Sequence, residues 1–281
     1  MPIKRYFSHD NLKRIKKDFN FLIKFVNKSF GEFDFAIRDN YFNIYYKGNS
    51  LAKVEFKKNE LYKITINNKF FGKTKFFKKT KADNPKFYTK KSGNNYISLI
   101  LTKKQLHPFF QKKHILEFAS RIKKVHNGEE IDFEQSLITD NLNRKKIIFI
   151  DRQVTDTILK RNRLDLLALK QIEGNKYKFL VSEVKLGNNK ELKNKVASQL
   201  DKYLKHVKTN FIDYKKCYEI QFTQKKELGL IEIPTINKIE IIKPVEGIII
   251  VGGYSGIAKK QMSELRAAFP NLIIKQFTNE L

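Results

Sequence analysis

The sequence predicts an α/β chain, α+β overall, in which a smaller basic α+β domain precedes a mixed sheet flanked by helices. Its length of 281 residues equals about two domains of roughly 150 residues each. Hydrophobic residues make up 41% of the chain, which is enough for packed cores. Short alternating runs near the N-terminus give way, from residue 111, to alternating helix and strand patterns. The predicted domains are therefore residues 1–110 and 111–281.

The first domain has the pattern of a helix followed by an antiparallel sheet. Apolar residues recur every three or four positions over residues 10–27, which predicts the helix. Four alternating runs separated by turn-forming residues predict the strands, which are residues 33–37, 41–46, 52–56 and 61–66. Residues 69–91 then mix nine lysines with phenylalanine and tyrosine. This mixture fits base stacking and phosphate contact, and it also fits core strands with a solvated lysine face.

In the second domain, helical and strand patterns alternate. The predicted helices are residues 111–125, 131–142, 190–208 and 257–268. The predicted strands are residues 146–150, 164–169, 178–185, 247–251 and 272–276. This order indicates a mixed sheet with helices on its faces.

The charge of the chain indicates a polyanionic partner. Lys and Arg total 57 against 29 Asp and Glu, a net charge of +28, and residues 1–110 hold 25 basic and 8 acidic residues. The commonest such partner is nucleic acid, and we expect DNA. We expect no membrane partner, because no apolar run approaches the roughly 18 residues of a span and no long amphipathic helix suits insertion. The charged N-terminus and single cysteine predict a cytoplasmic location.

Three ionisable residues stand in otherwise apolar strands, and they are the main candidates for chemistry. A turn at residues 173–175 joins two strands into a hairpin that brings Asp165 beside Glu183. Glu183 and Lys185 share a face because strand side chains alternate. Such charges are costly to bury unless they act together. A divalent cation would offset the repulsion between the carboxylates, and their oxygens suit Mg²⁺. The cluster therefore predicts metal-assisted phosphodiester hydrolysis, with Lys185 orienting the water or offsetting charge on phosphorus.

Asp165, seventeen intervening residues and then Glu183-Val184-Lys185 resemble the motif of the PD-(D/E)XK nuclease superfamily, the fold of many restriction and repair endonucleases. The resemblance covers about residues 111–281 and implies a restriction-endonuclease-like sheet. It implies Mg²⁺, with Mn²⁺ as a substitute, held by Asp165, Glu183 and the carbonyl of Val184, with Lys185 catalytic. Leu164 replaces the proline of the family's first motif.

The resemblance also implies two supporting residues on neighbouring helices. Gln199 suits the glutamine that follows the hairpin in several members. Glu134 suits the acid that precedes it and would hold the metal together with Asp165 and Glu183, with Glu117 as the runner-up. The expected protein is a DNA endonuclease of defence, restriction or repair, and a homodimer if it cuts both strands. Two alternatives stay open, namely a nuclease acting on RNA and a non-catalytic nucleic-acid-binding protein. In the latter, Glu183 and Lys185 form only a surface ion pair worth under about 1 kcal/mol.

Other motifs carry less chemistry. Residues 252–256 lack the lysine of a P-loop and predict a plain loop. His114 and Glu117 lie three apart on a predicted helix, where a solvated face is expected rather than a metal site, and Cys217 predicts a small core residue. A basic cluster before Asp165 fits either a substrate clamp or a solvated charge run, and it comprises Arg144, Lys145, Lys146, Arg152, Lys160, Arg161 and Arg163.

Overall fold

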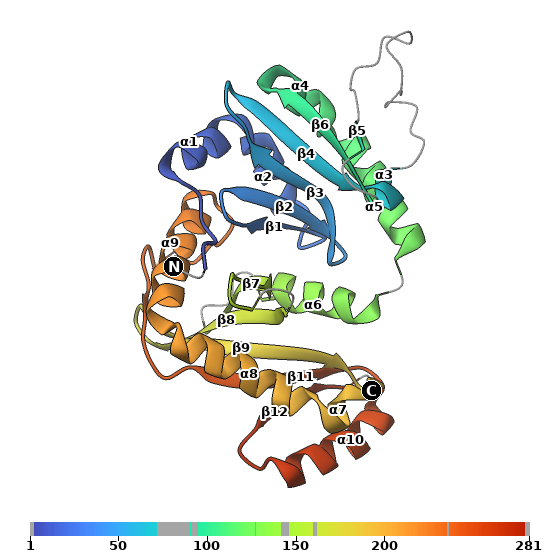
Figure 1. Ribbon diagram of the computed structural model, residues 1–281, viewed down its shortest axis with the longest axis vertical. Helices are drawn as coiled ribbons and strands as arrows, with labels where there is room; N and C mark the ends of the chain where they lie inside the picture. Colours follow the sequence, from blue (N-terminus) through green and yellow to red (C-terminus); the bar gives the residue numbers. More distant parts are fainter. Residues whose placement is uncertain are drawn as a thin grey trace. The chain divides into compact units, whose positions relative to one another are not determined.

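A computed structural model of the chain describes residues 3–71, 90–91, 95–126, 128–141, 146–159, 162–234 and 236–278. The chain divides into two compact units, each with its own sheet (Figure 1). The N-terminal unit comprises Arg5–Gly128 and Glu227–Leu230, and the C-terminal unit comprises Met1–Lys4, Glu129–Lys226 and Ile231–Leu281. Each unit is described by itself below.

The boundary between the units follows Gly128, so the predicted boundary after residue 110 is wrong. Helix α5, Lys112–Val125, begins just after the predicted boundary. Its apolar face, with Ile115, Phe118 and Ile122, is buried in the hydrophobic core of the N-terminal unit. Because this face packs on the first sheet, α5 belongs to the N-terminal unit.

The N-terminal unit contains an antiparallel sheet in the order β1-β2-β3-β4-β6-β5, and this confirms the predicted antiparallel strands. The strands are β1 Phe33–Ile37, β2 Tyr41–Tyr46, β3 Asn49–Phe56, β4 Leu61–Asn67, β5 Lys90–Lys91 and β6 Tyr96–Thr102. The other helices are α1 His9–Asp18, α2 Asn20–Asn27, α3 Asn68–Phe71 and α4 Lys103–Phe109.

The helix predicted over residues 10–27 is two helices, because the chain leaves helical geometry at Phe19. The ring of Phe19 is fully buried and makes edge contacts with Phe42 and Tyr62. In the lysine-rich segment 69–91, Phe70 and Phe71 are buried core residues. The expected core position of these two aromatics is confirmed, but they lie in helix α3 and not in a strand, and residues 72–89 lie outside the described residues.

The C-terminal unit contains a mixed sheet in the order β12-β11-β9-β8-β7, with β10 paired to β9. Strands β7, β8 and β9 are antiparallel neighbours, whereas β9, β11 and β12 run parallel. The strands are β7 Ile147–Val154, β8 Leu164–Glu173, β9 Lys176–Leu186, β10 Glu240–Ile241, β11 Glu246–Gly252 and β12 Ile273–Phe277. The helices are α6 Glu129–Thr139, α7 Glu191–Asn194, α8 Val196–Thr209, α9 Phe211–Glu227 and α10 Ser255–Ala268. The predicted mixed sheet flanked by helices is confirmed.

Helices α6 and α8 cover opposite faces of this sheet. A Cβ atom added to Gly247 of β11 would meet Leu204 of α8 at 2.7 Å, and one added to Gly252 would meet Phe133 of α6 at 2.5 Å. These two strand positions are an odd number of residues apart, so they point to opposite faces. Val184 of β9 packs with Leu137, Ile138 and other residues on the α6 face. Alternation therefore puts Glu183 and Lys185 on the α8 face.

Helix α9 is absent from the sequence-based elements. It buries Phe211, Tyr214, Tyr218 and Phe222 at helical spacing, but it also buries polar residues such as Gln221. Within the described parts of the chain, no helix is long and apolar enough to cross a membrane.

Candidate active site

The hairpin of β8 and β9 brings the three candidate residues together. The register pairs Leu166 with Ser182, and at the next position Asp165 faces Glu183. The strands meet at a tight turn where Gly174 has a φ of 50°, a conformation that glycine adopts without steric cost. Asp165, Glu183 and Lys185 stand close to fully buried apolar residues of the same strands, such as Leu166 and Val181. The hairpin thus forces these charges into one place.

Lys185 lies at the centre of the cluster. Its Nζ donates to Glu183 Oε1 at 2.9 Å and lies 3.7 Å from Asp165 Oδ2. The backbone of β9 also holds the side chain from β8, because the amide of Val184 donates to Asp165 Oδ2 at 3.0 Å. The side chains of Glu183 and Lys185 are only 3% and 6% exposed. The two carboxylates are thus neighbours on either side of one buried ammonium group, as the sequence predicts.

Two more carboxylates extend the cluster, and the sequence reasoning did not include them. Glu130, in the first turn of α6, lies 3.9 Å from Lys185 Nζ and accepts hydrogen bonds from the Leu186 amide and the Asn189 side chain. Glu191 of α7 lies 4.0 Å from the same Nζ. A signal for Glu130 existed, because it stands four residues before Glu134 on one helix and so shares its face.

The clustered charges shift the pKa values of their members. Burial raises the pKa of Glu183 to about 8, and the charge of Asp165 adds to the rise. Burial also raises the pKa of Asp165, although Lys185 and the Val184 amide oppose the rise. For Lys185, burial lowers the pKa, but the charges of Asp165 and Glu183 raise it more, so the net shift is upward. Lys185 is therefore an ammonium ion at neutral pH.

Glu134, rather than Glu117, lies near the cluster. Burial raises the pKa of Glu134 to about 7, and the charge of Asp165 is the second cause. Gln153 Nε2 donates to both oxygens of Glu134, at 3.1 and 3.0 Å, and Arg152 lies 3.4 Å away. Glu117 belongs to the N-terminal unit, where it pairs with Arg121 on the same helix.

Gln199 is half-buried on α8, and its Oε1 is buried without a hydrogen-bond partner among the described residues. Tyr203 lies one turn further along this helix. Its hydroxyl oxygen accepts a hydrogen bond from the backbone amide of Arg163, two residues before Asp165. Burial raises the pKa of Tyr203, and the charges of Glu183 and Asp165 contribute to the rise. Helix α8 therefore borders the cluster through Tyr203.

The cluster retains unused acceptor capacity. Glu183 Oε2, like Gln199 Oε1, is buried and accepts no hydrogen bond from any described residue. Both atoms are acceptors, and a cation or its water would satisfy them. The carboxylate and backbone oxygens of the cluster are ligands that suit a hard divalent ion. As arranged here, however, the described His, Cys, Asp and Glu side chains form no group of three or more that could hold a metal ion.

The remaining candidates have structural surroundings. Arg152 was expected in a substrate clamp or a solvated charge run, but it is 1% exposed and bonds to Gln135 and Glu134. A buried arginine can do neither, whereas Lys146 and Arg163 are exposed. Arg144, Lys145, Lys160 and Arg161 lie outside the described residues.

His114 is buried, and its Nδ1 lies 3.0 Å from the Phe109 carbonyl. The expectation that His114 lies on a solvated helix face is therefore wrong. Cys217 is buried on α9, which confirms its core position. The glycine-rich residues 252–256 include the end of β11 and the start of α10, and Gly253 has a φ of 66°.

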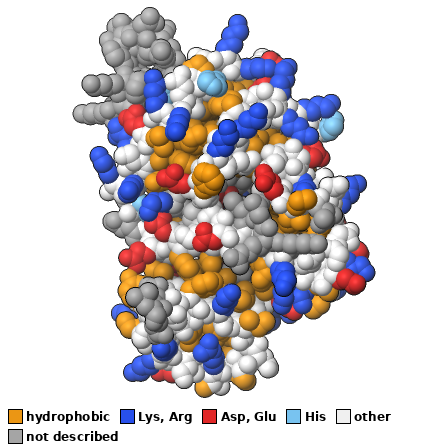
Figure 2. All heavy atoms as spheres, turned by 180° about the vertical axis from the view of Figure 1, so that it is seen from behind, with side chains coloured by type: hydrophobic (Ala, Val, Ile, Leu, Met, Phe, Trp, Pro, Cys, Tyr) orange, Lys and Arg blue, Asp and Glu red, His pale blue; other side chains and the backbone are white. Residues whose placement is uncertain are grey.

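Basic side chains are spread across the face seen in Figure 2 rather than gathered in one patch, and acidic side chains lie between them. The charge therefore does not by itself mark a path for a polyanion. Comparison of the chain with protein-family models found no match. Comparisons with curated proteins and with solved structures likewise found none. The functional argument therefore depends on the residues of the cluster.

Proposed function

We propose that the protein is a divalent-metal-dependent nuclease that hydrolyses phosphodiester bonds of DNA. One observation carries the proposal: Asp165, Glu183 and Lys185 meet in one largely buried place, with Lys185 Nζ within 4 Å of both carboxylates. Moving a charged side chain from water into the protein interior costs several kcal/mol of folding free energy per ion, even where charges of opposite sign pair. A catalytic site is a common reason for retaining such a cluster.

The order of elements supports the finer assignment to a restriction-endonuclease-like fold and to the PD-(D/E)XK superfamily. A helix with Glu134 precedes the three antiparallel strands, and a helix with Gln199 follows them before the parallel strand β11. This is the arrangement that the resemblance of the sequence implies. A cytoplasmic location, as the composition predicts, belongs to the same proposal.

Mg²⁺, or Mn²⁺ in its place, would be held by Asp165, Glu183 and the carbonyl of Val184, with Glu134 close by. When bound, the ion would polarise a phosphate oxygen and lower the pKa of a water molecule. The Glu183 Oε2 atom, which accepts no hydrogen bond within the described part of the chain, supports this assignment. Because the pKa of Glu183 is raised to about 8, a proton competes with the metal at neutral pH, and metal binding would release it.

Lys185 acts as a charge rather than as a base in this scheme, because its raised pKa keeps it protonated. An ammonium group here can orient the attacking water by donating to it, or it can stabilise negative charge that develops on the phosphate oxygens. Glu134 is fixed by Gln153 and Arg152, so its carboxylate is held in one orientation. Gln199 offers a side-chain carbonyl as a further acceptor.

One observation favours the alternative of a non-catalytic nucleic-acid-binding protein. Lys185 already pairs with Glu183 at 2.9 Å and with Asp165 at 3.7 Å, so the charge of these two carboxylates is compensated in part without a metal. In that case the net charge of +28 would bind nucleic acid without cutting it.

The two functions are separated by incubating the protein with supercoiled, linear and single-stranded DNA and with RNA, in Mg²⁺ or in EDTA. We expect strand scission of DNA in Mg²⁺ and none in EDTA. Binding of all four nucleic acids without Mg²⁺-dependent scission would contradict the proposal and support the alternative. Scission of RNA alone would retain the nuclease and reassign its substrate.

A further inference from the structure

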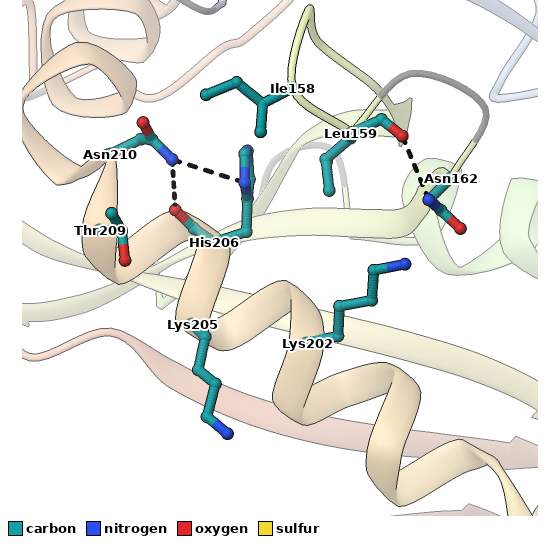
Figure 3. A pocket seen from close by; sticks show the side chains of 8 residues that line it. All are labelled: Ile158, Leu159, Asn162, Lys202, Lys205, His206, Thr209 and Asn210. Atoms are coloured by element: carbon teal, nitrogen blue, oxygen red, sulfur yellow. Dashed lines mark hydrogen bonds between the residues drawn. The ribbon is translucent and has the colours of Figure 1, made fainter.

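A pocket lies in the C-terminal unit, between α8 and the loop that joins β7 to β8 (Figure 3). Its volume is about 380 Å³, which lies in the usual range of roughly 300–1,000 Å³ for small-ligand sites. The lining residues are Ile158, Leu159, Asn162, Lys202, Lys205, His206, Thr209 and Asn210. None of them belongs to the carboxylate and lysine cluster.

The fully buried side chain of Asp156 fixes both walls of this pocket. Its Oδ1 accepts hydrogen bonds from the amides of Ile158 and Leu159, at 2.9 and 2.8 Å. Its Oδ2 lies 2.6 Å from His206 Nε2 on α8 and accepts from Tyr214. One carboxylate thus holds the apolar loop against the helix, so the pocket is a built feature of the fold.

The two walls differ in chemistry. Ile158 and Leu159 present apolar surface from the loop, and the Ile158 side chain is 56% exposed. Lys202 and Lys205 come from α8 (Figure 3). Lys205 pairs with the exposed Asp201 at 2.7 Å, whereas Lys202 has no ion-pair partner among the described residues. An apolar surface beside a free cation matches a ligand with a flat apolar part and an anionic part.

The pocket adjoins the proposed catalytic cluster along the chain and along α8. Asn162 stands three residues before Asp165. Tyr203, next to Lys202 on α8, accepts a hydrogen bond from the Arg163 amide and so ties this helix to the start of β8. A strand held with its phosphates near the cluster would therefore have nucleotides close to this pocket.

We propose that the pocket binds one unpaired nucleotide of the substrate strand, with its base against Ile158 and Leu159 and its phosphate on Lys202. This inference rests on the proposed function and names its substrate class. A base inside a duplex is stacked and paired, and extruding it costs a few kcal/mol. The substrate is therefore single-stranded, frayed or flapped DNA in preference to blunt duplex.

The test is the affinity of a fluorescein-labelled oligothymidylate in EDTA, compared with an abasic deoxyribose-phosphate oligomer of equal length. Removing roughly 40 Å² of the surface of a base from water against apolar side chains, at about 25 cal/mol per Å², strengthens binding about fivefold. We expect the intact oligomer to bind at least fivefold more tightly than the abasic one, and a blunt duplex to compete less well than single strands. Equal affinities of intact and abasic oligomers would overturn the proposal.

Matched variants locate the effect. Ile158→Asp should reduce the intact-to-abasic affinity ratio to about one, whereas Ile212→Asp, at an isoleucine that is 73% exposed on α9, should leave it unchanged. Lys202→Ala should reduce the slope of the logarithm of affinity against the logarithm of salt concentration by about 1, the value for one lost phosphate contact. Lys208→Ala, on the same helix but outside the pocket, should not change the affinity ratio. Equal effects of Ile158→Asp and Ile212→Asp would place the base elsewhere.

The failure of this proposal is distinguishable from that of the proposed function. If wild-type protein cuts DNA in Mg²⁺ but Ile158→Asp retains the affinity ratio, only the pocket assignment is overturned. If nothing is cut but the ratio depends on Ile158, the pocket stands and the nuclease does not. Free thymidine monophosphate is the third arm. If thymidine monophosphate displaces the labelled oligomer at a concentration equal to that of the oligomer, the pocket binds free nucleotides. That result would overturn the proposal that it binds a nucleotide of a DNA strand.

Discussion

Lys185 is the residue on which the electrostatics of the site depend. Four carboxylates lie within 4.0 Å of its Nζ, and their combined charge raises its pKa although burial lowers it. A buried ammonium ion that is already paired is poorly suited to take up a proton. It is well suited to hold a position and a charge.

Lys185→Ala should abolish cleavage of DNA in Mg²⁺ and leave affinity for DNA almost unchanged. The substitution removes the charge at the reacting centre, but only one positive charge of a net +28. Cleavage assays and fluorescence anisotropy in EDTA measure the two effects separately. Lys208→Ala removes an equal charge from an exposed position and serves as the control. Parallel loss of binding and cleavage in Lys185→Ala alone would count against a catalytic role.

Asp165→Asn should stop turnover and abolish the thermal stabilisation that Mg²⁺ gives to the wild-type protein. A ligand that binds only the folded state at a hundred times its Kd stabilises it by about 2.7 kcal/mol. Asparagine retains the shape of the side chain but removes one of the two central carboxylates. Melting temperatures in EDTA and in Mg²⁺ measure the effect, and Asp201→Asn on the exposed face of α8 is the control. An undiminished increase in Tm in Asp165→Asn would exclude this residue as a ligand.

At the scale of elements, the hairpin of β8 and β9 supplies the charges and α6 and α8 enclose them. Helix α6 is positioned by close contact, since Phe133 lies where a side chain at Gly252 of β11 would be. The same helix carries Glu130 and Glu134. The packing of one glycine thus controls the position of two acids of the site.

Gly252→Ala should reduce the free energy of unfolding by about 1–3 kcal/mol, because the new methyl group overlaps the ring of Phe133. It should also lower cleavage by displacing α6. Gly256→Ala is the matched control, because its Cβ meets no atom within 4 Å and lies in helix α10, where alanine is favoured by about 0.5–1 kcal/mol. Chemical denaturation measures both changes. Equal stability of the two variants would show that Gly252 does not position α6.

The sequence predicts the hairpin correctly because its physics is local. The alternation of side chains places Glu183 and Lys185 on one face of the sheet, and the tight turn brings Asp165 of the neighbouring strand beside them on that face. Helix α9 was not predicted, since buried Gln221 and Gln224 interrupt the apolar pattern. Glu130 and Glu191 were not included because their proximity to Lys185 depends on how α6 and α7 dock. The burial of Arg152 likewise depends on its pairing with Glu134 across two elements.

At the scale of the whole molecule, two units with separate cores share a high positive charge. The described basic side chains are dispersed on the face in Figure 2, so we expect the charge to act as a general field for polyanions. The boundary after Gly128 was not predictable from pattern alone, since α5 is amphipathic and could pack on either sheet. The burial of its apolar face in the core of the N-terminal unit shows that α5 belongs to that unit.

Affinity for DNA should fall by orders of magnitude as salt rises from about 50 to 200 mM, because binding releases counterions from each neutralised phosphate. Lys185→Ala should show the same logarithmic salt slope as the wild type, since Lys185 is buried and paired with carboxylates. Anisotropy titrations across this range measure the slope. An affinity that does not change with salt would contradict the role assigned to the net charge.

Anomalous diffraction from a crystal soaked in Mn²⁺ tests the central claim most directly, since Mn²⁺ replaces Mg²⁺ at oxygen sites and can be located by its scattering. We expect a peak within coordination distance of oxygen atoms of both Asp165 and Glu183, and no such peak in Asp165→Asn. A fully soaked wild-type crystal in which Lys185 still bridges Glu183 and Asp165, with no ion beside them, would contradict it.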